Sequence, residues 1–213
     1  NCIDSIVSIY ANGASSYTWS TLNGTILSGL NTPSITVGSP GSYHVIGFGD
    51  NGCTDSTEIT ITDNTTPPNI NLNASSNEIT CMDSIITLSA NGGISYNWSA
   101  INGNYISTTD STATINQGGL YIIEGTGING CNSSSMIYIS TNTTTPPINI
   151  LTSADTLTCL TQNINLNASG GSTHQWNTIN GSITTNSNSA TITINNPGTY
   201  IINAANPNGC SSL

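Results

Sequence analysis

The sequence predicts an all-β protein built from tandem antiparallel β-sandwich repeats, and three observations lead to this prediction. Tryptophan recurs at spacings of 79 and 78 residues, at Trp19, Trp98 and Trp176. Tyrosine recurs in the same rhythm, at Tyr43, Tyr121 and Tyr200. Between these positions, apolar and polar residues alternate in short stretches bounded by glycine turns, with no helical period.

The middle copy contains every expected element in chain order. Strands are predicted where apolar residues alternate with polar ones, around Ile70 and Leu72, Ile86 to Ala90, Tyr96 and Trp98, Ala113 and Ile115, Tyr121 and Ile123, and Met136 to Ile139. Turns are predicted at Asn91-Gly92-Gly93, Asn102-Gly103 and Asn129-Gly130. Six or seven short strands with regularly spaced turns are typical of an immunoglobulin-like sandwich. The tryptophans and tyrosines are therefore expected in the core, on equivalent strands.

Paired prolines mark the boundaries between copies. Pro67-Pro68 and Pro146-Pro147 each follow a pair of threonines, and such pairs make a short, semi-rigid connection. The predicted repeats are 1–65, 66–143 and 144–213. The first starts without an opening strand and the third ends before its last one, so we expect a window on a longer array. Stacked end to end, each repeat is expected to advance the array by roughly 35–40 Å.

Charge is almost absent. Only 5% of residues are charged and there is no Lys or Arg, which leaves a net charge of −10. Nucleic acids are bound mainly through Lys and Arg, and anionic membranes repel an acidic chain, so neither is an expected partner. No stretch approaches the roughly 18 apolar residues of a membrane span. Without lysine, Lys–Asn isopeptide cross-links cannot form, and trypsin-like proteases find no cleavage site.

A four-part motif recurs in each copy: a cysteine, Tyr-x-Trp, Gly-x-Tyr and Asn-Gly-Cys. In the middle copy it comprises Cys81, Tyr96-Asn97-Trp98, Gly119-Leu120-Tyr121 and Asn129-Gly130-Cys131. The order resembles the Ig-like repeats, related to PKD-like domains, of very large secreted adhesins in gliding and marine bacteria. That resemblance implies type IX secretion, an extracellular location at the cell surface, and a role as adhesin, filament or stalk. The third copy departs from the pattern with His174 in place of the first tyrosine.

Six cysteines form two series, one at Cys2, Cys81 and Cys159 and the other at Cys53, Cys131 and Cys210. Their constant spacing predicts a disulfide framework. The expected pairing lies within each copy, as Cys2–Cys53, Cys81–Cys131 and Cys159–Cys210, where each bond contributes on the order of 4 kcal/mol. An ordinary immunoglobulin topology separates these positions by roughly 25–30 Å, however. Pairing staggered from one copy to the next therefore stays open, as do free thiols.

Candidate sites for chemistry are few. His44 and His174 are the only general-base candidates of the usual kind. His44 falls on the outward phase of its strand and His174 replaces a core tyrosine, so surface and packing roles are expected. The chain has no GxSxG, P-loop or HExxH motif, so neither enzyme activity nor a cofactor is expected.

Oxygen-bearing side chains suit calcium, and some gather near the ends of repeats. Asp50, Asn51 and Asp55 flank one hairpin, and Asp63 and Asn64 precede a linker. The second linker has no equivalent acid, so solvated loops are favoured over metal sites. Glycosylation stays open at the Asn-x-Ser/Thr sequons Asn23, Asn64, Asn73, Asn97, Asn132, Asn142, Asn167 and Asn180.

Three functions fit the sequence. The leading hypothesis is a structural stalk or filament segment of a large repetitive surface adhesin or appendage, with neighbouring repeats as its partners. The second is an array in which each repeat binds a glycan or surface polymer. The third, related to the first, is self-association into a multi-chain fibre. Outward residues at equivalent positions differ (His44, Ile122 and Ile201), which favours a spacer over a repeated binding site.

Overall fold

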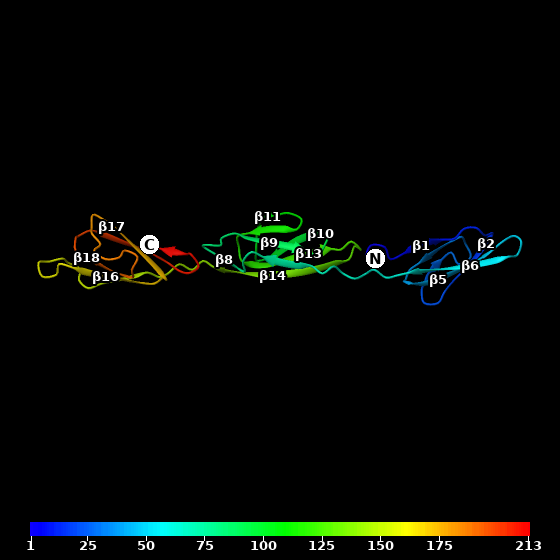
Figure 1. Cartoon of the computed structure of the whole chain (residues 1–213), viewed down its shortest axis with the longest axis horizontal. Helices are drawn as coiled ribbons and strands as arrows, with labels where there is room; N and C mark the ends of the chain where they lie inside the picture. Colours follow the sequence, from blue (N-terminus) through cyan, green and yellow to red (C-terminus); the bar gives the residue numbers. More distant parts are fainter. The chain divides into compact units, whose positions relative to one another are not determined.

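The computed structural model describes residues 1–213 as an all-β chain of strands β1 to β20, without helices (Figure 1). The chain divides into two compact units: Asn1–Asn71, Ala90–Asn97 and Ile123–Ser135 form the first, and Leu72–Ser89, Trp98–Ile122 and Met136–Leu213 form the second. The division crosses strands of the middle copy, so the predicted domain boundaries stay a prediction. For reference we call 1–65, 66–143 and 144–213 repeats 1, 2 and 3.

Repeat 1 lies in the first unit and consists of two three-stranded antiparallel sheets. One sheet has the order β1 (Val7–Tyr10), β4 (Ser34–Val37), β3 (Ile26–Ser28). The other has the order β2 (Ser16–Thr21), β5 (Gly41–Phe48), β6 (Thr54–Ile61). Alternate residues of these strands point inward and form one core: Ile9, Tyr17, Trp19, Ile35, Val37, Tyr43 and Val45.

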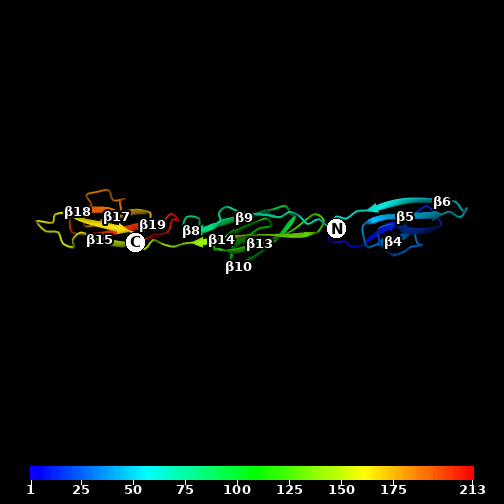
Figure 2. The ribbon, with the colours of Figure 1, turned by 90° about the horizontal axis from the view of Figure 1, so that it is seen from below.

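Repeat 2 has two four-stranded sheets. The first is β11 (Tyr105–Thr108), β12 (Thr112–Ile115), β9 (Ile86–Asn91), β7 (Asn71–Ala74). The second is β10 (Ser95–Ile101), β13 (Gly119–Thr126), β14 (Asn132–Asn142), β8 (Glu78–Thr80). All six predicted strands are confirmed. The sequence did not predict β8 and β11, which have three and four residues and too little alternation to stand out. β8 lies parallel beside β14 (Figure 2).

Repeat 3 also has two sheets. One contains β15 (Asn149–Thr152), β16 (Ile164–Ser169) and β18 (Thr191–Ile194). The other contains β17 (Thr173–Ile179), β19 (Thr199–Ala205) and β20 (Ser211–Ser212). The register repeats that of repeat 1, because Trp176 lies opposite Ile202 as Trp19 lies opposite Val45. Sheets that are antiparallel apart from the β8–β14 pair, packed two by two around apolar cores, confirm the predicted immunoglobulin-like sandwich fold.

The predicted core aromatics lie on equivalent strands, and four of the six are buried: Trp19, Trp176, Tyr43 and Tyr121. Trp98 and Tyr200 are half-buried and pack against the edges of their cores. Each tryptophan donates its indole N–H to a backbone carbonyl oxygen. The acceptor is Thr32 for Trp19 at 3.0 Å, Asp110 for Trp98 at 3.1 Å, and Ser189 for Trp176 at 3.0 Å. The same bond in three copies shows that these positions are structurally equivalent.

Each core tyrosine anchors the corner before its strand. Tyr43 donates its hydroxyl to the carbonyl of Ser39 at 2.6 Å, and Tyr121 does the same to Gln117 at 2.6 Å. Tyr200 donates to Asn196 at 2.7 Å. A hydroxyl that reaches back four residues in this way is the tyrosine corner typical of immunoglobulin-like sandwiches.

The two histidines have structural contacts. His174 places Nε2 at 2.9 Å from the carbonyl of Gly170, across the turn that precedes its strand. Tyr17 holds the equivalent turn of repeat 1 by accepting the N–H of Ala14 at 2.9 Å. A ring nitrogen therefore replaces a phenol in the same bracing role. His44 is half-exposed opposite Glu58 on β6, which agrees with its predicted outward phase.

Alkaline pH is expected to destabilise repeat 2. Burial raises the pKa of the Tyr105 phenol to about 12, and Tyr121 adds to the rise. Because the folded pKa lies above the unfolded value of 10.0, the stabilisation is complete below pH 10 and is lost as the pH rises through about 12. The free energy of unfolding, measured in urea between about pH 10 and 12, should fall less steeply with pH for Tyr105→Phe than for the unaltered chain. Equal slopes for the two proteins would contradict the assignment.

Candidate functional site

Two disulfides connect residues of successive repeats. Cys2 of repeat 1 is bonded to Cys131 of repeat 2, and Cys81 of repeat 2 to Cys210 of repeat 3. Both bonds span 129 residues of sequence, and their Cα–Cα distances are 4.9 and 5.1 Å. The first lies inside the first compact unit and the second inside the second. The same connection is therefore made twice.

The expected pairing within each copy is wrong. In repeat 2, Cys81 follows β8 and precedes β9, whereas Cys131 lies in the hairpin between β13 and β14. These positions belong to opposite ends of a sandwich, which strands of about eight residues separate by roughly 25 Å. A disulfide needs Cα atoms about 4.4–6.8 Å apart, so only the staggered partner is within reach. Cys53 and Cys159, predicted as disulfide cysteines, are free and exposed.

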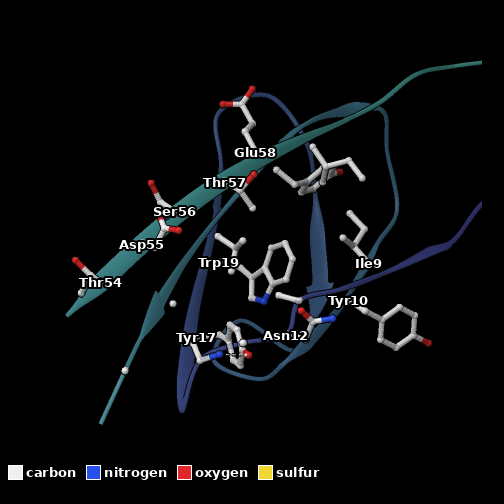
Figure 3. Close-up of a pocket in the computed structure, with 18 of the residues that line it drawn as sticks. Ile9, Tyr10, Asn12, Tyr17, Trp19, Thr54, Asp55, Ser56, Thr57 and Glu58 are labelled. Carbon is white, nitrogen blue, oxygen red and sulfur yellow. Dashed lines mark hydrogen bonds between the residues drawn. The ribbon is translucent and has the colours of Figure 1, made fainter. Parts of the chain in front are cut away.

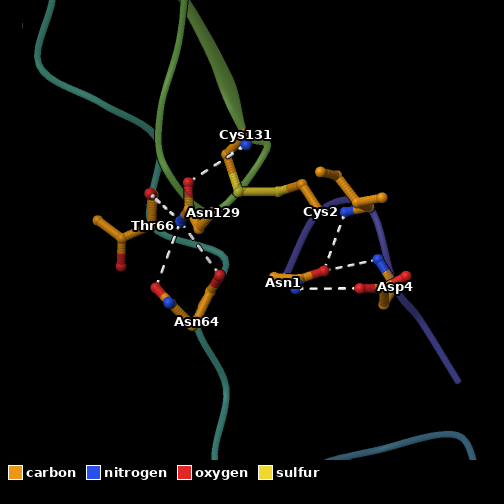
Figure 4. The surroundings of a disulfide bond; sticks show 8 residues. Asn1, Cys2, Asp4, Asn64, Thr66, Asn129 and Cys131 are labelled. Carbon is orange, nitrogen blue, oxygen red and sulfur yellow. Dashed lines mark hydrogen bonds between the residues drawn. A yellow bond between two sulfur atoms is a disulfide. The ribbon is translucent and has the colours of Figure 1, made fainter. Parts of the chain in front are cut away.

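An asparagine side chain holds the linker beside the first disulfide (Figure 4). Asn129 donates its amide N–H groups to the carbonyls of Asn64 and Thr66, at 3.1 and 2.9 Å, and lies 3.3 Å from Asn64 Oδ1. Its Oδ1 accepts the backbone N–H of Cys131 at 3.2 Å. Asn129 is buried, and its donors and its acceptor are all used. One amide thus ties the disulfide hairpin to the linker that enters repeat 2.

Asn208 repeats this arrangement beside the second disulfide. Its amide nitrogen donates to the carbonyls of Asn142 and Thr144, at 3.0 and 3.1 Å, and to Asn142 Oδ1 at 3.0 Å. Its Oδ1 accepts the N–H of Cys210 at 3.0 Å. Asn206 adds a second donor to Thr144 at 3.1 Å. The agreement of the two sites indicates a built contact, used once in each compact unit.

The side chains that follow Cys2 and Cys81 in sequence, Ile3 and Met82, pack directly against the glycines of the two hairpins. A Cβ added to Gly130 would lie 2.2 Å from the side chain of Ile3, and one added to Gly209 would lie 2.2 Å from that of Met82. The backbone N–H groups of Cys2 and Cys81 donate to the carbonyls of Asn129 and Asn208, at 3.0 and 3.1 Å. Glycine is required here twice over, by this close approach and by φ values of 76° and 80°.

These two contacts, which we call the junction hairpins (Asn129–Cys131 and Asn208–Cys210), are the candidate functional site. The sequence analysis identified the cysteines of these hairpins but did not predict that the asparagines donate hydrogen bonds to the linker. The available signal was the triplet Asn-Gly-Cys at the same place in all three copies. The residues considered for calcium do not assemble into a cluster of three or more acidic, His or Cys side chains, and Asp50, Asp55 and Asp63 are exposed.

Replacing Asn129 by Ala should lower the free energy of unfolding of the first unit by about 2–3 kcal/mol, because the buried N–H of Cys131 loses its acceptor and two linker carbonyls lose their donor. Asn51→Ala is the matched control, since Asn51 is exposed and only accepts the N–H of Cys53. Its expected loss is below about 1 kcal/mol. Urea denaturation of the oxidised proteins measures both. Equal losses would mean that the linker contacts add nothing.

Comparisons with known proteins add little. No protein-family model and no curated protein matches the chain. Among solved structures, an amphioxus IgVJ-C2 molecule is similar at 15% identity and TM-score 0.30, over 63% of this chain and 96% of that one. A protocadherin gammaB7 EC3-6 fragment gives 12% and 0.34, over 97% and 66%. Drosophila OTK extracellular domains 3-5 give 11% and 0.28, over 98% and 89%. These TM-scores are too low to assign a fold, and the immunoglobulin-like fold is assigned from the strands and cores described above.

The structure contains no candidate for a membrane-spanning helix.

Proposed function

We propose that this chain is a segment of an extracellular structural stalk or filament, belonging to a large repetitive bacterial surface adhesin or appendage. The observation that carries the proposal is the staggered disulfide. Each of the two bonds joins the segment before β1 or its equivalent β9 in one repeat to the junction hairpin of the next. A protein whose work is done inside one domain has no need of covalent bonds between domains. An array that bears tension along its length does need covalent bonds between its domains.

The junctions suit mechanical work for a second reason. Repeats 1 and 2 are connected by the backbone of the linker and, in parallel, by Cys2–Cys131. The Asn129 amide fixes the linker carbonyls beside this bond. Two covalent connections at one junction leave less freedom to bend than a single linker, because the ends of the flexible segment are fixed at both sides. Tension is shared between them.

Composition and redox chemistry support the location. Disulfides persist in oxidising environments such as the cell exterior and are rare in the cytosol. A chain without Lys or Arg offers trypsin-like proteases no site, folded or unfolded. The resemblance of the repeat motif to adhesin repeats points the same way. We accordingly place the protein outside the cell, as a durable spacer at the surface.

Binding of a glycan or surface polymer by each repeat is less well supported. The aromatic residues that would line such a site, Trp19 and Tyr17 among them, belong to the core and are buried. On β5 and its equivalents, the outward positions carry His44, Ile122 and Ile201, which present no common surface. A glycan array probed with the chain is expected to give no repeat-dependent signal.

Small-angle scattering of the oxidised chain tests the stalk. If three repeats each advance the array by roughly 35–40 Å, the maximum dimension should be on the order of 105–120 Å. It should change little over a range of ionic strengths, because no salt bridges are involved. A dimension of about half this value, with repeats folded against each other, would overturn the proposal.

A further inference from the structure

Repeat 1 contains an open groove of about 670 Å³ (Figure 3). Its floor includes Tyr17 and Trp19, one side is the β6 segment Thr54–Ile59, and the other side is the Ile9–Ala14 segment at and after the end of β1. The groove runs to the hairpin that contains Asn51 and Cys53. It therefore combines an apolar floor, two strand edges and a free thiol.

The opening strand segments of repeats 2 and 3 cover the equivalent position. A Cβ at Gly92 would lie 1.9 Å from the carbonyl oxygen of Asn69, just before β7, and one at Gly170 would lie 1.9 Å from that of Pro147, just before β15. Gly13 is the equivalent glycine of repeat 1 and has the same backbone conformation, with φ 92° against 100° and 96°. Nothing lies within 4 Å of its Cβ position. The glycine is shaped for a backbone that no part of this chain places there.

The residues that surround the opening strand of repeat 2 have counterparts in the groove of repeat 1. In repeat 2, Ile70 is buried against Gly125 and Tyr96, with its Cδ1 at 2.3 Å from a Cβ built on that glycine. The corresponding residues of repeat 1 are Gly47 and Tyr17, and both line the groove. An inward isoleucine of an extended segment would lie beside Gly47 and Tyr17, next to Ala14, whose Cβ is 2.8 Å from a Cβ built on Gly47.

The two strand edges beside the groove are unpaired. β1 pairs only with β4, and β6 pairs only with β5. Their equivalents in repeat 2 have a further neighbour, since β9 also pairs with β7 and β14 also pairs with β8. An exposed row of backbone N–H and C=O groups is a template for an added strand.

The hairpin at the end of the groove is already in the bonded conformation. Gly49 donates to the carbonyl of Cys53 at 2.8 Å, as Gly127 does to Cys131. Cys53 donates its N–H to Asn51 Oδ1 at 3.0 Å, as in both junction hairpins. Gly52 has φ 79° and nothing within 4 Å of its Cβ position, where Gly130 and Gly209 hold an apolar side chain.

We propose that the groove of repeat 1 binds an entering β-strand presented by another repeat of this type, and that Cys53 then forms a disulfide with the cysteine loop of that repeat. The strand has the chemistry of residues 64–75, Asn-Thr-Thr-Pro-Pro followed by Ile, Leu and Ala at alternate positions. The Asn51 amide holds its Asn-Thr-Thr segment, and β1 pairs with its extended part. The proposal rests on the proposed function, because the partner is a like repeat of the array.

The covalent step is an exchange of thiols and disulfides. The Cys53 thiol and the partner thiol together lose two protons and two electrons, and the sulfur–sulfur bond forms. A small disulfide such as oxidised glutathione accepts them and is reduced to two thiols. Noncovalent docking comes first and sets the partner, because it brings the two sulfur atoms within bonding distance.

Strand binding is tested with the full chain and a synthetic peptide of residues 64–75. Hydrogen exchange of the Val7–Tyr10 amides should slow by about tenfold when the peptide is bound, while that of Ile86–Asn91 stays unchanged. A peptide with Asp in place of Ile70 and Leu72 should have no effect. Protection by neither peptide, or by both equally, overturns strand binding.

A pair of glycine variants locates the peptide. Gly13→Asn places a side chain where the entering backbone would lie, and asparagine tolerates a positive φ, so repeat 1 should stay folded and peptide protection should be lost. Gly52→Asn is the matched control, with the same replacement at an open glycine outside the strand path, and should bind as before. Protection of the β5 amides (Gly41–Phe48) from hydrogen exchange reports that repeat 1 is folded in both variants. Undiminished protection in Gly13→Asn contradicts the proposal.

The disulfide is tested with the Cys159→Ser chain and a peptide of residues 78–84, which contains Cys81 and Met82. In a glutathione buffer this peptide should couple to Cys53 at least about tenfold more completely than a scrambled peptide, and Gly52→Asn should abolish the difference. Equal coupling of both peptides overturns a selective hairpin. If scattering shows an extended chain but neither peptide binds, this inference fails alone. If scattering instead shows a folded-back chain, the proposed stalk function fails as well.

Discussion

Joint replacement of Cys2 and Cys131 by Ser is expected to lower the free energy of unfolding of the first unit by about 5 kcal/mol. In the chain-entropy model, a cross-link that closes a loop of 129 residues restricts the unfolded chain by this amount. The effect is large against the total stability of a small domain, roughly 5–15 kcal/mol. Replacing both cysteines avoids adding a newly unpaired thiol to the two, Cys53 and Cys159, that are already free.

The control is the chain with Cys53→Ser and Cys159→Ser. Both thiols are free and exposed, so their loss should change the stability by no more than about 0.5 kcal/mol. Urea denaturation of the oxidised proteins gives the comparison, and peptide mapping without reductant identifies the bonds. Recovery of cross-linked peptides that join Cys2 to Cys53 would refute the staggered arrangement.

The second large effect is expected from Gly92→Ala. A methyl group there would lie 1.9 Å from the carbonyl oxygen of Asn69, and backbone cannot yield as a flexible side chain can. The segment that leads into β7 must therefore move, and Ile70 leaves its pocket beside Gly125. We expect a loss of about 3 kcal/mol or more, in the range of core disruptions.

Gly13→Ala separates the clash from backbone strain. Gly13 and Gly92 have φ values of 92° and 100°, so alanine is strained equally in both. Only Gly92 has an atom in the way. The Gly13 variant should consequently lose about 1 kcal/mol, the strain alone. Equal losses in urea denaturation would show that the opening strand contributes little, and faster hydrogen exchange of Asn71–Ala74 in Gly92→Ala would show that the strand has been released.

Local pattern was enough to predict the sandwich. Alternation around Ile86 to Ala90 and around Tyr121 and Ile123 predicted β9 and β13, because a strand with one buried face must repeat every two residues. β8 and β11 escaped notice, since their pairing comes from neighbouring strands rather than from their own residues. His174 was placed in a packing role, which its contact with Gly170 supports.

Periodicity and alternation along the chain are enough to predict the repeat, the class of fold, and the aromatic residues in or beside the cores, because a residue pattern follows burial directly. They do not determine the disulfide partners. Staggered and internal pairing satisfy the same spacing of cysteines, so no count along the chain can tell them apart. Only the tertiary structure decides, since a sulfur atom bonds to what lies within a few ångströms. Cys81 and Cys131 belong to opposite ends of one sandwich, and each meets a cysteine of a different repeat.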